Sequence, residues 1–376
     1  MTTASAPAPA PAPAPLSLLH AEDPHATPVV IGIDGGATYS YGVAVDFNGQ
    51  ALATAKSGSL NFFGTSLQEA RRSLTQLVRT LETSLPLGNR LVHTVIGSAA
   101  LFSEATSREK EMLCRGIVTL EATRLVSDVM TAYHAAGLGQ PGVLIVGGTG
   151  SSFLARNERG EFAQVGAWGH LLGDEGSAYW LGRECIRAAI AASEGSGPAT
   201  CLLDVVLRWF DVKVLNDIVP IIYQPKYSKD RFAALAGYAA QHADPGDTLW
   251  MDICQRAGQD LARQALAAIR LVDLRIRPVP VWLNGSVVSK NAVVQESVYR
   301  TMRDELPVTF EPMLLAPLLG AAALALESAG IHADRALVDR LAKTYAAAVA
   351  ASAPKVSPPA SPPPQPVPTG PPGPSA

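Results

Sequence analysis

Two apolar runs, each followed at once by a glycine-rich turn, constrain the fold of this chain more than any other feature. Residues 29–33 lead into Asp34-Gly35-Gly36-Ala37-Thr38, and residues 143–146 lead into Gly147-Gly148-Thr149-Gly150-Ser151. Glycines let backbone N–H groups approach phosphate oxygens without interference from a Cβ atom, and a nearby hydroxyl adds a donor. Either turn alone is better explained as a simple tight turn. Because both turns open a similar three-strand unit, the pair predicts two phosphate-binding loops.

The first half of the chain has the pattern of an α/β lobe. Strands are predicted at residues 29–33, 40–47 and 51–57, with Asn48-Gly49 as a hairpin turn. Residues 66–85 then show apolar residues at helical spacing, with Ser66 as the N-cap. A strand at 91–96, a helix near 108–114 and a strand at 124–126 complete this lobe. The order β-β-β-α-β-α-β is typical of a sheet with hairpins on one side and crossover helices on the other.

The second half repeats the three-strand opening and then becomes mostly helical. Strands are predicted at 143–146, 152–157 and 162–165, and helices at 176–193, 199–210, 230–242 and 248–272. The remaining predicted elements are a strand at 280–283, a helix near 290–304, a strand at 308–310 and helices at 314–329 and 333–350. We therefore expect two related lobes around a cleft.

Length and composition set the domain boundaries. At 376 residues the chain exceeds the usual size of a single domain. Residues 1–27 are rich in Ala and Pro, and residues 353–376 are rich in Pro, so both are expected to be disordered tails. The first lobe is predicted at 28–130 and the second at 131–352, with the last helices able to pack back on the first lobe.

Charge and hydropathy exclude several classes of partner. The formal net charge is −3, with 30 basic and 33 acidic residues and no long basic run, so nucleic acid is not an expected partner. The Ala-rich segments at 321–329 and 345–351 are flanked or interrupted by charges, which favours packed helices over a membrane span. The N-terminus lacks the pattern of a signal peptide, and we expect a cytoplasmic protein.

The four cysteines are far apart and form no C-x-x-C pair, which argues against a sequence-local metal site and favours small core residues: Cys114, Cys185, Cys201 and Cys254. The chain also lacks the P-loop pattern, a G-x-G-x-x-G after a strand, H-E-x-x-H and G-x-S-x-G. The remaining interpretation is phosphate chemistry on a scaffold that uses none of these motifs.

Three acids stand at the ends of predicted strands or the start of a helix. Asp34 ends a buried strand, where a carboxylate suits a cation such as Mg²⁺ bound through water, or a turn. Asp128 precedes a helix and could be only its N-cap. Asp174, followed by Glu175, could likewise be a first-turn acid of the helix after it. The preceding loop, which contains Trp168 and glycines, favours a binding role for this segment.

Taken together, these motifs resemble N-acetylglucosamine kinases, within the BadF/BcrA-type ATPases of the sugar kinase, Hsp70 and actin superfamily. The resemblance covers about residues 29–329, and its most specific part is Trp168-Gly169-His170 with Gly173-Asp174-Glu175-Gly176-Ser177-Ala178-Tyr179-Trp180. It implies two ribonuclease-H-like lobes, as in actin-like ATPases, that close on ATP and an amino sugar. A homodimer is the assembly that this family suggests.

The resemblance also assigns residue roles. Asp128 matches the catalytic acid, which would orient the sugar 6-hydroxyl and accept its proton. Asp34 would hold Mg²⁺ through water. The residues implied for ATP are Gly35, Gly36, Thr38, Gly148, Thr149, Gly150, Ala257, Gly285 and Ser286. Those implied for the sugar are Asn61, Asp128, Trp168, Gly169 and Asp174.

The sequence departs from the family pattern at small residues. Ala37 and Ala167 stand where glycine is common, and Ser98-Ala99-Ala100 replaces a turn richer in glycine. Because the replacements are small, we expect phosphate binding to be retained. The motifs do not distinguish N-acetylglucosamine kinases from glucosamine kinases or N-acetylmuramic acid kinases. Two alternatives stay open: an ATP-driven activator of a 2-hydroxyacyl-CoA dehydratase or benzoyl-CoA reductase, which needs closely placed cysteines, and a sugar sensor without catalytic activity.

Overall fold

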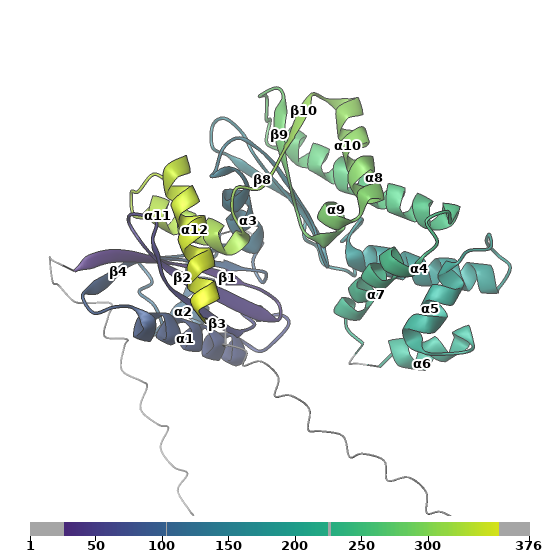
Figure 1. Ribbon diagram of the computed structural model, residues 1–376, viewed down its shortest axis with the longest axis horizontal. Helices are drawn as coiled ribbons and strands as arrows, with labels where there is room; N and C mark the ends of the chain where they lie inside the picture. The colour runs from purple at the N-terminus through teal and green to yellow at the C-terminus, as the bar shows by residue number, and fades with distance from the viewer. Residues whose placement is uncertain (1–25, 103, 225–226, 353–376) are drawn as a thin grey trace, which may run out of the picture.

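The protein contains two five-stranded sheets with the same strand order (Figure 1). The computed structural model describes residues 26–352, except 103 and 225–226. With the five strands of each sheet numbered by their order along the chain, the spatial order is 3-2-1-4-5 in both sheets. In each sheet the first three strands pair antiparallel as two hairpins, and the last two join in parallel. The predicted α/β architecture with a repeated sheet is confirmed.

The first sheet and its helices form the first lobe. Its elements are β1 (Thr27–Gly35), β2 (Tyr39–Asp46), β3 (Ala51–Gly58), α1 (Leu67–Ser84), β4 (Asn89–Ser98), α2 (Ser107–Cys114) and β5 (Thr123–Ser127). The predicted N-cap of α1 is confirmed: Glu69 N–H donates to Ser66 Oγ at 3.1 Å, and the Glu69 carboxylate accepts from Ser66 N–H at 3.0 Å. Apolar residues of α1 pack on one face of the sheet, in a cluster that includes Leu74, Leu77 and Leu81.

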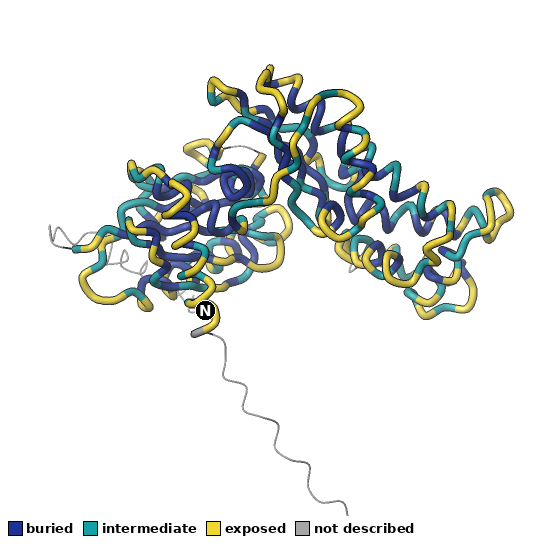
Figure 2. The backbone as a smooth tube through the Cα atoms, turned by 45° about the horizontal axis from the view of Figure 1, so that its top comes forward, coloured by how far each residue is buried: buried dark blue, intermediate teal, exposed yellow. Residues whose placement is uncertain are grey.

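The second lobe contains the second sheet and most of the helices. Helix α3 (Asp128–Gly137) leads into it, so the boundary predicted at residue 130 falls inside this helix. The strands are β6 (Gly142–Gly147), β7 (Ser151–Arg156), β8 (Phe162–Gly166), β9 (Val279–Asn284) and β10 (Val308–Glu311). The helices are α4 (Ala178–Ser193), α5 (Leu202–Phe210), η2 (Leu215–Ile218), α6 (Val219–Ile222), α7 (Lys229–His242), α8 (Thr248–Leu271), α9 (Ser286–Lys290) and α10 (Ala292–Glu305). Figure 2 shows that each lobe has its own buried interior.

The helix predicted near 290–304 is present as α10, and the separate short helix α9 precedes it. Helix α9 ends at Lys290, and α10 begins after Asn291. The Asn291 side chain accepts hydrogen bonds from Val293 and Val294 N–H at 3.1 Å, so it acts as the N-cap of α10. The short helices η2 and α6 were not predicted.

The last two helices, α11 (Pro317–Ser328) and α12 (Arg335–Ser352), lie on the first lobe (Figure 1). A Cβ atom on Gly32 of β1 would lie 2.4 Å from the backbone nitrogen of Ala322, so α11 lies directly on the strand. On α12, Thr344 Oγ1 accepts a hydrogen bond from Ala51 N–H at 3.0 Å. Both Ala-rich segments are helical, but residues 321–326 are buried on the first lobe, whereas most of residues 345–350 are exposed. Within the described residues, no helix is long and apolar enough to cross a membrane.

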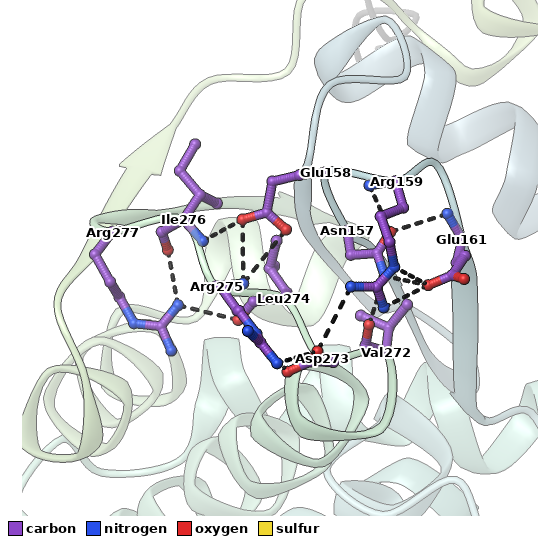
Figure 3. Close-up of polar contacts among 10 residues, drawn as sticks. All are labelled: Asn157, Glu158, Arg159, Glu161, Val272, Asp273, Leu274, Arg275, Ile276 and Arg277. Atoms are coloured by element: carbon purple, nitrogen blue, oxygen red, sulfur yellow. Dashed lines mark hydrogen bonds and ion pairs between the residues drawn. The ribbon is translucent and has the colours of Figure 1, made fainter.

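A polar network ties the β7–β8 turn to the loop between α8 and β9 (Figure 3). Buried Asn157 donates to the Val272 carbonyl at 2.7 Å and accepts from Arg159 N–H at 2.9 Å and Glu161 N–H at 3.0 Å. The Glu158 carboxylate accepts hydrogen bonds from the backbone N–H groups of Arg275 and Ile276. This network fixes one end of the second sheet, away from the glycine turns at its other end.

Candidate active site

The two glycine turns lie in the wall of one cavity between the lobes. We call this the main cavity; it measures about 540 Å³, and Gly36 and Ala37 of the first turn line it together with Gly148, Thr149 and Gly150 of the second. Among the predicted site residues, those in its wall are Gly36, Asp128, Gly148, Thr149, Gly150, Gly169 and Asp174. A cavity of this size can hold a small polar ligand and phosphate groups.

The second glycine turn is held against the start of α4. Backbone N–H groups of Ala178 and Tyr179 donate to the carbonyls of Gly148 at 2.9 Å and Thr149 at 3.2 Å. A Cβ atom on Gly148 would meet nothing within 4 Å, so this part of the backbone is open to a ligand. Gly150 is different, because a Cβ atom added at this position would lie 2.8 Å from Asp174 Oδ1. Close approach between this turn and Asp174 therefore requires glycine at position 150.

Asp174 is not a first-turn acid of α4, since Ser177 is the N-cap and accepts from Trp180 N–H at 3.2 Å. Asp174 lies before the helix in a left-handed conformation with φ of 63°. Its carboxylate is buried and accepts a hydrogen bond from Ser151 N–H at 3.0 Å. The remaining oxygen positions are available for donors on a ligand, such as sugar hydroxyls.

Asp128 is not the N-cap of α3 either. The cap is Ser127, whose Oγ accepts from Met130 N–H at 3.3 Å, so the Asp128 side chain is left to line the cavity. Burial raises the pKa of Asp128, while hydrogen bonds from nearby backbone N–H groups and the charge of Lys229 oppose that rise. Asp128 is thus a carboxylate at a cavity wall with an increased affinity for a proton.

Asp34 lies at the end of β1, close enough to Asp128 for their charges to interact. Burial, and to a lesser extent the charge of Asp128, raise the pKa of Asp34 to about 6. A carboxyl group whose ionisation is disfavoured by a neighbouring acid provides a place for a cation. Within the described residues, no group of three or more His, Cys, Asp or Glu side chains could hold a metal ion by itself. The pair therefore fits Mg²⁺ that keeps waters and binds ligand phosphates, rather than a closed protein site.

The first glycine turn is packed more tightly than the second. A Cβ atom on Gly35 would lie 2.5 Å from the Gly97 carbonyl oxygen, and the Gly36 carbonyl accepts from Ser59 Oγ at 3.2 Å. Thr38 is exposed and lies outside the wall of the main cavity. Asn61 uses its side-chain oxygen to accept from Phe63 N–H at 3.1 Å, and its amide nitrogen has no partner among the described residues.

Trp168 is 67% exposed and is not among the residues that line the main cavity. Its ring centroid is 5.6 Å from that of Phe102, which belongs to the first lobe and lines the main cavity. The adjacent Gly169 has a φ of 77° and lies in the cavity wall. His170 packs edge-on against Tyr179, with 4.9 Å between the ring centroids, so the structure gives His170 a packing role.

A second cavity of about 260 Å³ lies between α7 and α9. Ser286 is in its wall, and Gly285 precedes it with φ of 102°; a Cβ atom on Gly285 would lie 2.5 Å from the Gly147 carbonyl oxygen. The other wall residues are mostly small and apolar, which suits a nucleoside. Ala257 does not line either cavity: it is fully buried, and its carbonyl oxygen lies 2.5 Å from where a Cβ atom on Gly176 would be.

Sequence reasoning missed several residues of the main cavity. Phe63 and Phe102 come from loops of the first lobe, Gln164 from β8, and Lys229 from the first position of α7. No local motif marks any of them, because they reach the cavity only through the packing of elements far apart in sequence. The cysteines do not form a site at this cavity: Cys114, Cys185 and Cys254 are buried and Cys201 is partly buried.

The comparisons with known proteins agree with this geometry. A model of the BadF/BadG/BcrA/BcrD ATPase family matches residues 31–325. The chain belongs to this family. Within it, the chain is similar to the N-acetyl-D-glucosamine kinase of Dictyostelium discoideum, with 29% identity over 80% of this chain and 98% of that relative. It is also similar to the N-acetylmuramic acid/N-acetylglucosamine kinase of Clostridium acetobutylicum, with 26% identity over 69% of this chain and 85% of that relative.

A solved structure supports the fold of this BadF-type ATPase. A candidate N-acetylglucosamine kinase from Chromobacterium violaceum superposes with a TM-score of 0.61 at 23% identity, over 81% of this chain and all of that one. The predicted family resemblance and the two-lobe fold are therefore confirmed.

Proposed function

We propose that this protein is a kinase that transfers the γ-phosphoryl group of ATP to the 6-hydroxyl of N-acetylglucosamine or a close relative. The observation that carries this proposal is the main cavity, where a partly buried acid, Asp128, lies in the same wall as glycine turns from both lobes. Two relatives that act as amino-sugar kinases support it. The proposal extends to amino-sugar salvage and to a homodimer, both of which rest on the family resemblance.

Asp128 would act as the base. Its carboxylate accepts the proton of the sugar hydroxyl while that oxygen forms a bond to the γ-phosphorus. The bond from the γ-phosphorus to the bridging oxygen breaks, and its electron pair leaves on ADP. The increased proton affinity of Asp128 supports this role, because a base must hold the proton once it has taken it.

The glycine turns and the second cavity would position the nucleotide. The hydroxyl of Thr149 would supply a donor for phosphate oxygens, the open space at Gly148 would let a phosphate approach, and Gly36 lines the cavity from the first lobe. The nucleoside would lie in the second cavity beside Ser286. Mg²⁺ near Asp34 would neutralise charge on the phosphates.

The sugar would lie in the main cavity between Asp128 and Asp174. Asp174 accepts hydrogen bonds from sugar hydroxyls, and Gly169 leaves room for the ring. The Asn61 amide nitrogen has no partner among the described residues and suits a donor role, and Trp168 provides an exposed apolar face beside Phe102 of the cavity wall.

The test is ADP release by the purified protein with Mg-ATP and, separately, N-acetylglucosamine, glucosamine, N-acetylmannosamine, N-acetylmuramic acid and glucose. We expect release that depends on an amino sugar, with a product heavier by one phosphoryl group at oxygen 6. ATP hydrolysis that is indifferent to every sugar would favour an activator-type ATPase. Binding of sugar without turnover would favour a sensor.

A further inference from the structure

Lys229 is the only cation among the described residues that line the main cavity. It shares the wall with Asp128 and Asp174, yet its ammonium group makes no hydrogen bond or ion pair with any described residue. Lys229 is a partly buried residue, and its ammonium group is available for an anion that a ligand brings.

The stability of the fold does not explain a lysine at this position. Lys229 is the first residue of α7, where the positive end of the helix dipole lies. A cation there costs about 0.3–1 kcal/mol, whereas an acid would be stabilising. A role in binding accounts for the residue type, and a role in helix formation does not.

Helix α7 also connects the two cavities. Ala233, Ala236, Gly237 and Ala240 line the second cavity, while Lys229 reaches the main cavity. The rise of an α-helix places Lys229 roughly 10 Å along the axis from Ala236. This separation suits an extended triphosphate, so a nucleoside in the second cavity would bring its terminal phosphate near Lys229 and the Gly148–Gly150 turn.

We propose that Lys229 is a further catalytic residue, whose ammonium group contacts the phosphoryl group while it moves from ATP to the acceptor hydroxyl. The inference rests on the proposed kinase function. The moving group carries negative charge on its equatorial oxygens, and a fixed cation in a cleft stabilises that charge. Because Lys229 also opposes the rise in the pKa of Asp128, it helps to keep the base ionised before the reaction.

The test compares Lys229→Met and Lys229→Arg with Lys213→Met, which removes an exposed lysine outside both cavities. Initial rates are measured with N-acetylglucosamine and with N-acetylmuramic acid. Calorimetry then measures binding of ADP alone and of ADP with aluminium fluoride, which mimics the phosphoryl group in transfer. For Lys229→Met we expect kcat to fall about 10²–10³-fold with KM for the sugar nearly unchanged, as for loss of one charge-stabilising donor.

We further expect Lys229→Arg to recover part of the rate and Lys213→Met to match the wild type. Lys229→Met should lose affinity for ADP with aluminium fluoride but keep its affinity for ADP, and its melting temperature should not fall. A kcat within threefold of wild type would overturn the proposal. A defect confined to N-acetylmuramic acid would also overturn it, because the ammonium group would then bind the sugar carboxylate.

If the wild type phosphorylates none of the sugars, the proposed function fails, and the fluoride experiment alone decides the role of Lys229. Selective loss of the fluoride complex would support it, and equal affinities would contradict it.

Discussion

Replacing Asp34 by asparagine should make the protein more stable and less active. The Asp34 carboxylate makes no hydrogen bond with any described group, and burial together with the charge of Asp128 raises its pKa from 3.8 to about 6. An ionised Asp34 is therefore a cost to the folded state when Mg²⁺ and nucleotide are absent. Asparagine keeps the shape and removes the charge.

The size of the effect follows from linkage between protonation and folding. Because the pKa is higher in the folded state, the folded protein binds more protons between pH 3.8 and 6, and stability falls as pH rises through this window. A shift of this size corresponds to about 3 kcal/mol once both states are ionised, and to about 1.6 kcal/mol at pH 5. The stability advantage of Asp34→Asn should therefore grow by about 1.4 kcal/mol from pH 5 to pH 8.

The assay is urea unfolding followed by circular dichroism, with EDTA and without nucleotide, at pH 5 and pH 8. Asp304→Asn is the matched control, because Asp304 is exposed on α10 and its removal should have the same small effect at both pH values. Phosphoryl transfer by Asp34→Asn should fall as its stability rises. The reasoning is refuted if Asp34→Asn is no more stable than wild type at pH 8, or if its advantage is the same at both pH values.

Two further substitutions test the geometry of the second lobe. Gly150→Ala would place a Cβ atom 2.8 Å from Asp174 Oδ1 and displace this carboxylate, so the KM for the sugar should rise about tenfold or more in steady-state kinetics, the effect of about 1.4 kcal/mol. Asn157→Ala removes hydrogen bonds to Val272 and within its own turn and leaves buried groups unpaired, so the free energy of unfolding in urea should fall by about 2–4 kcal/mol.

Each of these substitutions has a matched control. Gly148→Ala adds a Cβ atom that meets nothing within 4 Å, so the KM of this variant for the sugar should stay near that of the wild type, even if its KM for ATP changes. An equal rise in both variants would show that Asp174 is not the cause. Asn48→Ala alters an exposed turn and should leave stability within about 0.5 kcal/mol. If Asn157→Ala behaves in the same way, the network of Figure 3 does not stabilise the lobe.

Local sequence patterns predicted the parts of the fold that depend on neighbouring residues. The capping box at Ser66 and the hairpin at Asn48-Gly49 each need only a few adjacent residues, and both are present. The two glycine turns were predictable because each directly follows an apolar strand. Their meeting in one cavity could only be expected from the repeated pattern and the family resemblance.

Other features depend on tertiary packing that no local pattern records. Lys229 comes from a helix far along the chain from Asp128, and their proximity depends on how the lobes pack. From the sequence, Asp174 was a candidate first-turn acid of a helix. Its backbone instead has a left-handed conformation, and its carboxylate accepts a hydrogen bond from Ser151 N–H. Asn291 interrupts an apolar helical pattern because its side chain caps the next helix, and periodicity alone cannot distinguish such a break.

The most direct measurement of the central claim is phosphoryl transfer by Asp128→Asn beside the wild type, with ATP binding measured by calorimetry on the same samples. We expect sugar-dependent transfer by the wild type, a rate lower by about 10²–10⁴-fold in the variant, and ATP affinity that is nearly unchanged. Turnover by Asp128→Asn close to that of the wild type would show that the acid at the wall of the main cavity has no part in the reaction.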